Sequence, residues 1–161
     1  MVTGGNSGNP NNKTYYHNFK TGLWTDGPEL HNARYMHACK CFYITGEKTL
    51  IVAGGFGDGG KLKSVEFLSL EHEDKGWHSG TTTDLPEAMA EFSMVPSLDQ
   101  KSVFAIGGDD GGKRNEILEL SCDGTNVDSC NWENSPTSLK HPREDLVALL
   151  IPDSLVDELC N

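Results

Sequence analysis

The sequence predicts an all-β fold built from three copies of one repeat. An aliphatic run ending in two glycines, Leu50–Gly55, recurs as Ser102–Gly108, and Met1–Gly5 matches its end. Short aliphatic runs that stop at glycine are typical of buried strands followed by tight turns. A lone tryptophan follows each double glycine, at Trp24, Trp77 and Trp132. These three observations indicate a repeat of about 50 residues.

Each copy is expected to form the same series of strands. The expected strands cover 2–5, 14–19 and the region from 22 in the first copy; 34–44, 50–55, 64–70 and the region of Trp77 in the second; and 92–96, 103–108, 116–122 and the region of Trp132 in the third. The aliphatic run 146–151 predicts one more strand. Residues 153–161 have no double glycine and predict an end segment, with a short helical turn capped by Ser154.

An acidic residue precedes an apolar one between the glycines and the tryptophan in two copies. These pairs are Glu66 before Phe67 and Glu119 before Leu120. Their place within the repeat predicts that both carboxylates accept hydrogen bonds from backbone or arginine groups, rather than act as general acids or bases. The double glycines predict sites where neighbouring strands leave no room for a Cβ atom.

The spacing of double glycine, acid and tryptophan resembles the Kelch repeat, which forms one four-stranded blade of a β-propeller. The resemblance covers essentially the whole chain. It implies repeats at 1–33, 34–91 and 92–143, a final inner strand at 144–152 and a tail at 153–161. It also implies that the tryptophans are buried wedges between blades. Propellers use about four to eight blades, so we expect part of a larger propeller, or a homodimer that completes six blades.

Composition and charge exclude several classes of protein. The formal net charge is −11, and an acidic surface repels phosphate backbones, so no nucleic-acid partner is expected. No run approaches the ~20 apolar residues of a membrane span. No signal peptide is visible at the start of the sequence.

Cysteine positions and one glycosylation motif bear on the compartment. Cys122 and Cys130 flank a polar loop between two expected strands, a position that favours a disulfide and an oxidising compartment; the alternative is two reduced thiols in a cytosolic loop. Cys39 and Cys41 share one strand face and are not expected to bond to each other. Asn12 begins an acceptor triplet for N-glycosylation. Together these features favour a secreted or extracellular protein over a cytoplasmic one.

The Kelch resemblance implies a non-enzymatic scaffold that binds another protein. Partners of that family dock on the loops after the double glycine and on the segments that lead into each inner strand. The residues of this chain at the first set of positions are Asn6, Phe56, Asp58, Asp109 and Asp110, and those at the second are Arg34, Tyr35, Glu91 and Arg143. Because acidic residues stand at several of these positions, we expect a basic or mixed-charge protein partner.

Two alternative functions remain open at this point. Some Kelch-like propellers resemble galactose oxidase, and others are isomerase-type or iron-dependent specifier-type proteins. No matching set of ligands is found here, so no catalytic residue, metal or cofactor is expected. The acidic loop Asp109–Gly112 lacks the ligand spacing of a calcium cage. The other alternative is a substrate-recruiting adaptor of a ubiquitin ligase. His37 is expected to be a packed core residue rather than a ligand or base.

Overall fold

The structure is a computed structural model that describes residues 1–44, 46–80, 82–124 and 126–152. This part of the chain is all-β; its only helices are two 3-10 turns, η1 (Glu73–Lys75) and η2 (Val127–Ser129). No helix in these ranges is long and apolar enough to cross a membrane. The tail expected at 153–161, with Ser154 and Cys160, lies outside the described residues.

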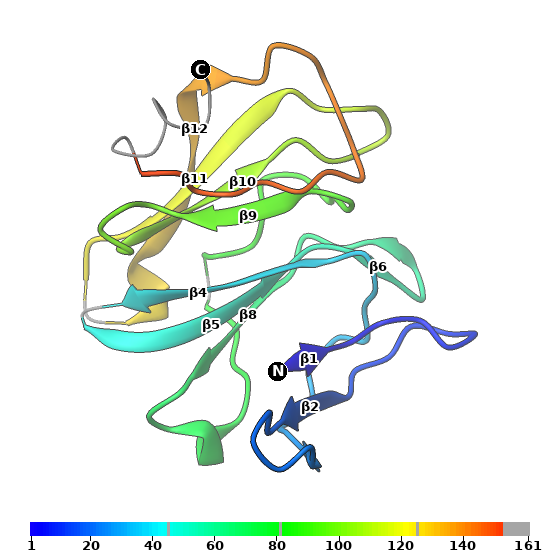
Figure 1. Ribbon diagram of the computed structural model, residues 1–161. Coiled ribbons are helices and arrows are strands. Elements are labelled where there is room, and N and C mark those ends of the chain that lie inside the picture. Colours follow the sequence, from blue (N-terminus) through cyan, green and yellow to red (C-terminus); the bar gives the residue numbers. More distant parts are fainter. Residues whose placement is uncertain (45, 81, 125, 153–161) are drawn as a thin grey trace.

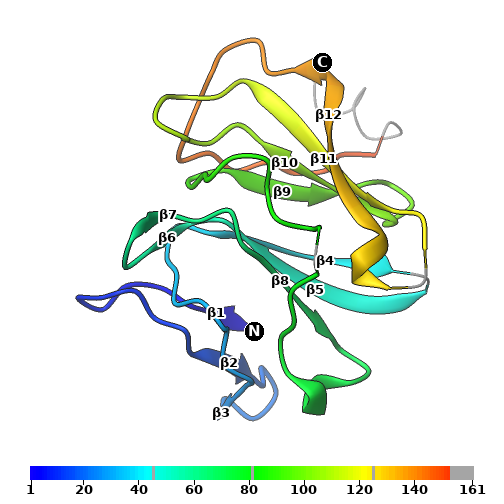
Figure 2. The same ribbon diagram turned by 180° about the vertical axis from the view of Figure 1, so that it is seen from behind.

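Three antiparallel sheets follow one another along the chain and lie in successive layers (Figures 1 and 2). The first sheet contains β1 (Val2–Thr3), β2 (Thr14–His17) and β3 (Trp24–Asp26). The second contains β4 (Ala38–Ile44), β5 (Glu47–Ala53) and β8 (Val65–Ser69), and the third β9 (Ser93–Pro96), β10 (Ser102–Ile106), β11 (Glu116–Cys122) and β12 (Cys130–Ser138). A small hairpin of β6 (Phe56–Gly57) and β7 (Gly60–Lys61) follows β5.

Each double glycine packs against the backbone that leads to the next sheet. Gly5, Gly55 and Gly108 donate their amide hydrogens to the carbonyls of Arg34, Met89 and Arg143, at 2.8, 2.9 and 2.9 Å. The first glycine of each pair is left-handed, and a Cβ atom added to Gly54 would lie 2.3 Å from the Met89 oxygen. The predicted steric role is therefore confirmed for both glycines of the second and third pairs and for Gly4, whereas no atom lies within 4 Å of a Cβ atom added to Gly5.

The segments that follow these three carbonyls share an unusual backbone conformation. Met36, Glu91 and Asp145 each lie two residues after the acceptor, and each has a positive φ, of 52°, 61° and 51°. Left-handed backbone is uncommon outside glycine, so its recurrence at one repeat position shows that 34–38, 89–93 and 143–147 follow the same path. The structure thus contains three equivalent copies of this turn.

Two of the three tryptophans are buried, as the sequence predicts. Trp77 is 3% exposed and donates its indole N–H to the Pro28 carbonyl at 2.9 Å; Trp132 is 7% exposed and donates to Thr83 in the same way. The prediction is wrong for Trp24, which is 57% exposed. Trp24 pairs with His17 at the outer edge of the first sheet, where no other sheet of the described chain packs on it.

The strand predicted at 146–151 is also corrected. These residues run back beside β9 (Figure 1) but join no sheet. Asp145 donates its amide hydrogen to the Glu91 carbonyl, and Ala148 donates to the Ser93 hydroxyl. Beyond these bonds no strand of the described chain offers a ladder of backbone partners, which a strand requires. Likewise, the region of Trp77 forms only an isolated bridge, Phe67 with His78.

The core is divided between two seams. The second seam, between the second and third sheets, is filled by buried side chains from both: Ala38, Phe42, Ile44, Ile51, Ala53, Val65, Phe67, Leu85, Met89, Phe92, Met94, Val103, Ala105, Leu118, Leu120, Cys130 and Trp132. The first seam, between the first and second sheets, contains a smaller cluster of Leu30, Val52, Leu68 and Trp77.

Candidate functional site

The loops after the double glycines and the segments that lead into β4 and β9 form one surface, here called the loop face. It comprises residues 6–10, 35–36, 56–61, 90–91, 109–113 and 144–145. Two backbone bridges connect its parts: Tyr35 exchanges hydrogen bonds with Phe56, and Ala90 with Asp109. These bridges bring together residues that are far apart in the sequence.

One part of the loop face is aromatic. The rings of Tyr35 and Phe56 stack with centroids 5.4 Å apart. The ammonium group of Lys61, on β7, lies 5.7 Å from the centre of the Phe56 ring and donates to the Asp109 carboxylate at 2.5 Å. Lys61 therefore connects the aromatic pair to the acidic part of the same face.

The acidic part contains three carboxylates that lie close together. One oxygen each from Glu91, Asp109 and Glu144 lies within 4.8 Å of the other two. Burial and the neighbouring charges of Asp145, Glu144 and Asp109 raise the pKa of Glu91. The hydrogen bond from Lys61 lowers the pKa of Asp109. These oxygens could hold a divalent cation or a cationic side chain.

Other residues predicted for this site are placed less closely. Asn6 and Asp58 lie at exposed loop positions, and Asp110 pairs with Arg114 at 2.8 Å. Arg143 is exposed, and its Nε donates to the His141 carbonyl at 3.5 Å. The structure thus brings Tyr35 close to Phe56 and Glu91 close to Asp109, whereas no contact joins Asn6 or Arg143 to those clusters in the described residues.

Arg34 is a correction, because its side chain is fully buried rather than on the loop face. Its guanidinium donates to the carbonyls of Gly54 and Ser64 at 2.8 and 2.9 Å, to the Ser64 hydroxyl, and to the Glu66 carboxylate at 2.7 Å. Burial lowers the pKa of Arg34, and the Glu66 charge opposes that shift. Arg34 therefore holds the second sheet together and cannot touch a partner.

Glu66 confirms the predicted role of the repeat carboxylate, whereas Glu119 does not. Glu66 is also fully buried and accepts hydrogen bonds from the amides of His31 and Asn32 at 2.7 and 3.0 Å. Glu119 is half-buried, and its carboxylate has no hydrogen-bond or ion-pair partner among the described residues.

Glu66 and Glu119 differ because the strand after the double glycine is shifted by one residue between the second and third repeats. The pairs Ala53–Val65 and Ile106–Ile117 are equivalent, which places Leu118 rather than Glu119 at the position of Glu66. The third sheet also carries Met89 at the position of Arg34, as the bonds to the double glycines show. An apolar pair thus stands where the second sheet has an ion pair.

The predicted disulfide is present, and the predicted glycan acceptor is engaged in the fold. Cys122 and Cys130 are bonded between β11 and β12. The Asn12 side-chain nitrogen, the atom that would carry a glycan, donates to the Leu30 carbonyl at 3.3 Å and to Glu29 at 3.0 Å. A glycan on Asn12 would have to replace both bonds.

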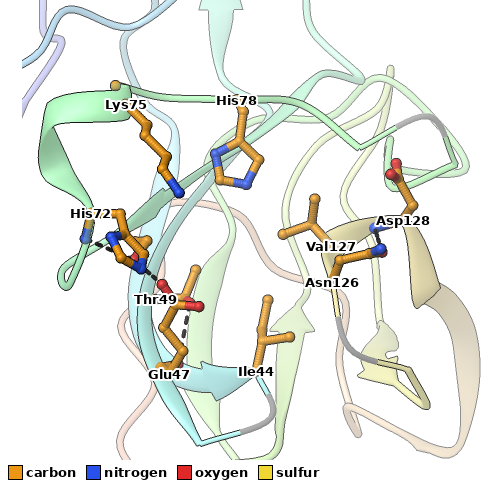
Figure 3. A pocket seen from close by; sticks show the side chains of 11 residues that line it. Ile44, Glu47, Thr49, His72, Lys75, His78, Asn126, Val127 and Asp128 are labelled. Carbon is orange, nitrogen blue, oxygen red and sulfur yellow. Dashed lines mark hydrogen bonds between the residues drawn. The ribbon is translucent and has the colours of Figure 1, made fainter.

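A separate pocket of about 430 Å³ lies at the opposite ends of the strands. Figure 3 shows its lining: His72, Lys75 and His78 come from the segment after β8, and Asn126, Val127 and Asp128 from the region of η2. Glu47 at its floor accepts a hydrogen bond from the Ser69 hydroxyl. The pocket mixes both signs of charge, from Lys75 on one side and Glu47 and Asp128 on the other.

No protein-family model matches the chain, and no curated protein matches it either. The functional argument therefore depends on the geometry of the loop face. Sequence reasoning overlooked Lys61, Lys113 and Glu144. Their positions in the repeat could have indicated them. Lys61 and Lys113 pair with Phe56 and Asp109 across the turns after the double glycines, and Glu144 is equivalent to Tyr35 and Ala90.

Proposed function

We propose that the three sheets are blades of a Kelch-type β-propeller and that the chain is a non-enzymatic scaffold that binds another protein through its loop face. The recurrence of the double-glycine turn in three copies supports the blade assignment. The disulfide between Cys122 and Cys130 supports a secreted or extracellular location, since such bonds persist in oxidising compartments.

The group of carboxylates formed by Glu91, Asp109 and Glu144 carries the functional proposal. Lys61 and Lys113 each pair with one of its members, at 2.5 and 3.0 Å, whereas the Glu91 carboxylate forms no ion pair among the described residues. A carboxylate outside an ion pair, beside a stacked aromatic pair, is suited to a basic segment, because an arginine or lysine can bind the acid while its neighbours pack on the rings.

Peptide binding measured by fluorescence anisotropy tests this proposal. We would compare two peptide panels of matched length, one rich in arginine and aromatic residues and one in which glutamate replaces arginine. We expect binding of the basic panel only, with an affinity that falls as salt is raised. Equal binding of both panels would contradict the proposal.

Variants locate the binding to this face. Glu91→Gln with Glu144→Gln should weaken binding at least about tenfold, since each charge-assisted hydrogen bond contributes about 1.5–3 kcal/mol. The control is Glu71→Gln, an exposed carboxylate at the opposite end of the second sheet. If the control weakens binding as much as the double variant, the interaction reflects net charge and not this face.

A further inference from the structure

We propose that two copies of this chain assemble head to tail, with residues 146–151 of each copy forming the missing inner strand beside β1 of the other. The proposal does not depend on the ligand of the loop face. It rests on the free edge, the exposed tryptophan and the groove at the first sheet, and on the conformation and exposure of the segment 143–151, which lies far from that sheet in one copy (Figures 1 and 2).

The first sheet has a free edge where its neighbours have a strand. In the described chain β1 pairs only with β2, whereas β5 lies between β8 and β4, and β10 between β11 and β9. Gly55 and Gly108 are each crowded by a carbonyl of the segment before that extra strand: a Cβ would lie 2.6 Å from the Tyr35 oxygen and 2.8 Å from the Ala90 oxygen. The space around Gly5 is open.

The other open feature of the first sheet is Trp24. Trp77 and Trp132 donate their indole N–H groups to the carbonyls of Pro28 and Thr83. Pro28 lies in the connection from the first sheet to the second, and Thr83 in the connection from the second to the third. Trp24 occupies the equivalent position, opposite His17, but is exposed. By the same spacing, Thr137 of a second copy would supply the carbonyl that Trp24 lacks.

The segment 143–151 begins with the same backbone turn as the segments that lead into β4 and β9, but it joins no sheet of the described chain. Arg143 accepts from Gly108 and Asp145 is left-handed, as in the segments that lead into β4 and β9. The side chains that follow are apolar and turned to solvent: Val147 and Leu149 are 84% and 80% exposed. Exposed apolar residues at strand spacing indicate a surface that is covered in the assembled protein.

The first seam contains a groove that would receive these side chains. It has a volume of about 310 Å³ and lies between β1 and the second sheet. Its lining is largely apolar: Met1, Cys39, Cys41, Leu50, Ile51, Val52 and Trp77, with Thr3 and Lys40. In β4, Ala38 and Phe42 face the third sheet, and the equivalent residues Val147 and Ile151 would face this groove.

The repeat fixes the register of the new strand pair. Ala38 pairs with Ala53 and Cys39 with Val52; Ser93 pairs with Ile106 and Met94 with Ala105. The equivalent pairs are Val147 with Thr3 and Ala148 with Val2. Glu144 would then bridge Asn6, as Tyr35 bridges Phe56, so the loop face is completed only by the second copy. Two such contacts close a ring of six sheets, three from each copy.

Disulfide trapping tests the register. In a background where Cys39, Cys41 and Cys160 are replaced by serine, Val2→Cys is combined with Ala148→Cys. Opposed Cβ atoms lie about 4.5–5.5 Å apart, so mild oxidation should give a covalent dimer. The control Val2→Cys with Val147→Cys directs one thiol to the other face and should give at least about tenfold less dimer.

Thiol labelling of the wild-type chain provides a test without engineered cysteines. Cys39 and Cys41 should react more slowly as protein concentration is raised, and Trp24→Ala should restore fast labelling, while near-UV circular dichroism shows that the fold is kept. Covalent monomer only, a ladder of polymers, equal trapping by the control pair, or labelling rates independent of concentration would each overturn the two-copy assembly.

Discussion

The second seam is filled by side chains from every strand of the two sheets beside it, whereas no strand of the first sheet contributes to the cluster in the first seam. That smaller cluster comes from β5, β8, Trp77 and the connecting residue Leu30. The difference follows from the short strands of the first sheet and from the free edge of β1. Equal repeats in sequence thus give unequal cores when one sheet lacks a strand.

Truncating the tryptophans should give the largest difference in unfolding free energy between the two seams. Trp132→Ala removes a buried ring and its bond to Thr83 from the second seam, and should destabilise the chain by about 3–5 kcal/mol. Trp77→Ala should cost less, because the first seam is already open to the groove. Trp24→Ala should change stability by less than about 0.5 kcal/mol in the monomer. Urea unfolding measures all three, and an equal cost for Trp24 and Trp132 would contradict the comparison.

The buried ion pair of Arg34 and Glu66 should give the next largest change in unfolding free energy. Glu66→Gln leaves the Arg34 charge buried without a counter-charge and should cost about 3 kcal/mol. Glu119→Gln is the matched control in the third sheet and should have a much smaller effect, since the Glu119 carboxylate has no hydrogen-bond or ion-pair partner among the described residues. Chemical denaturation of the two variants side by side checks this, and similar losses would show that the register shift is wrong.

Removal of the disulfide should act on the second seam. Cys122 and Cys130 are eight residues apart, and loop closure of that length corresponds to about 2.5 kcal/mol. Cys130 is buried in the second-seam cluster, so Cys122→Ser with Cys130→Ser should lower the urea midpoint. Hydrogen exchange should show weaker protection of β11 and β12 with little change in the first sheet. Uniform loss of protection would contradict a local effect.

The smallest effect concerns pH and the first seam. His37 lies beside β1, with its Nε2 2.9 Å from the Thr3 hydroxyl oxygen. Burial, with a smaller contribution from Arg34, lowers the pKa of His37 to about 4, whereas Glu66 opposes the shift. The unfolded chain binds the proton more readily, so stability should fall as pH drops from about 6.5 towards 4.

A matched variant isolates this contribution from the carboxylates that titrate in the same range. His37→Asn should flatten the pH dependence of the unfolding free energy by about 1–2 kcal/mol between pH 7 and 4. Parallel curves for the wild type and the variant would show that His37 does not titrate with folding.

Much of the fold could be predicted from local sequence. The double glycines and the aliphatic runs before them gave the positions of β5, β10 and their partners, because strand and turn preferences act over a few residues. Trp24 and 146–151 could not be predicted this way. Their exposure depends on which sheets stand beside them, and the sequence pattern is the same whether or not a neighbour is present.

The candidate site was predictable in outline only. Position after a double glycine correctly indicated Phe56 and Asp109 as residues of one surface. Position before an inner strand was misleading for Arg34, because its guanidinium turns inward and pairs with the buried carboxylate of Glu66. Glu119 could not be distinguished from an equivalent of Glu66, because the loops after the second and third double glycines differ by one residue in length. Only the strand pairing shows this difference.

The most direct test of the unequal seams is the solution mass of the wild-type chain, measured by light scattering after size exclusion without reductant. Closure of the first seam by a second copy predicts twice the chain mass of 17.6 kDa, and a return to 17.6 kDa for Val147→Asp with Leu149→Asp. A wild-type mass of 17.6 kDa at every concentration, with Trp24 still accessible to a quencher, would contradict the account.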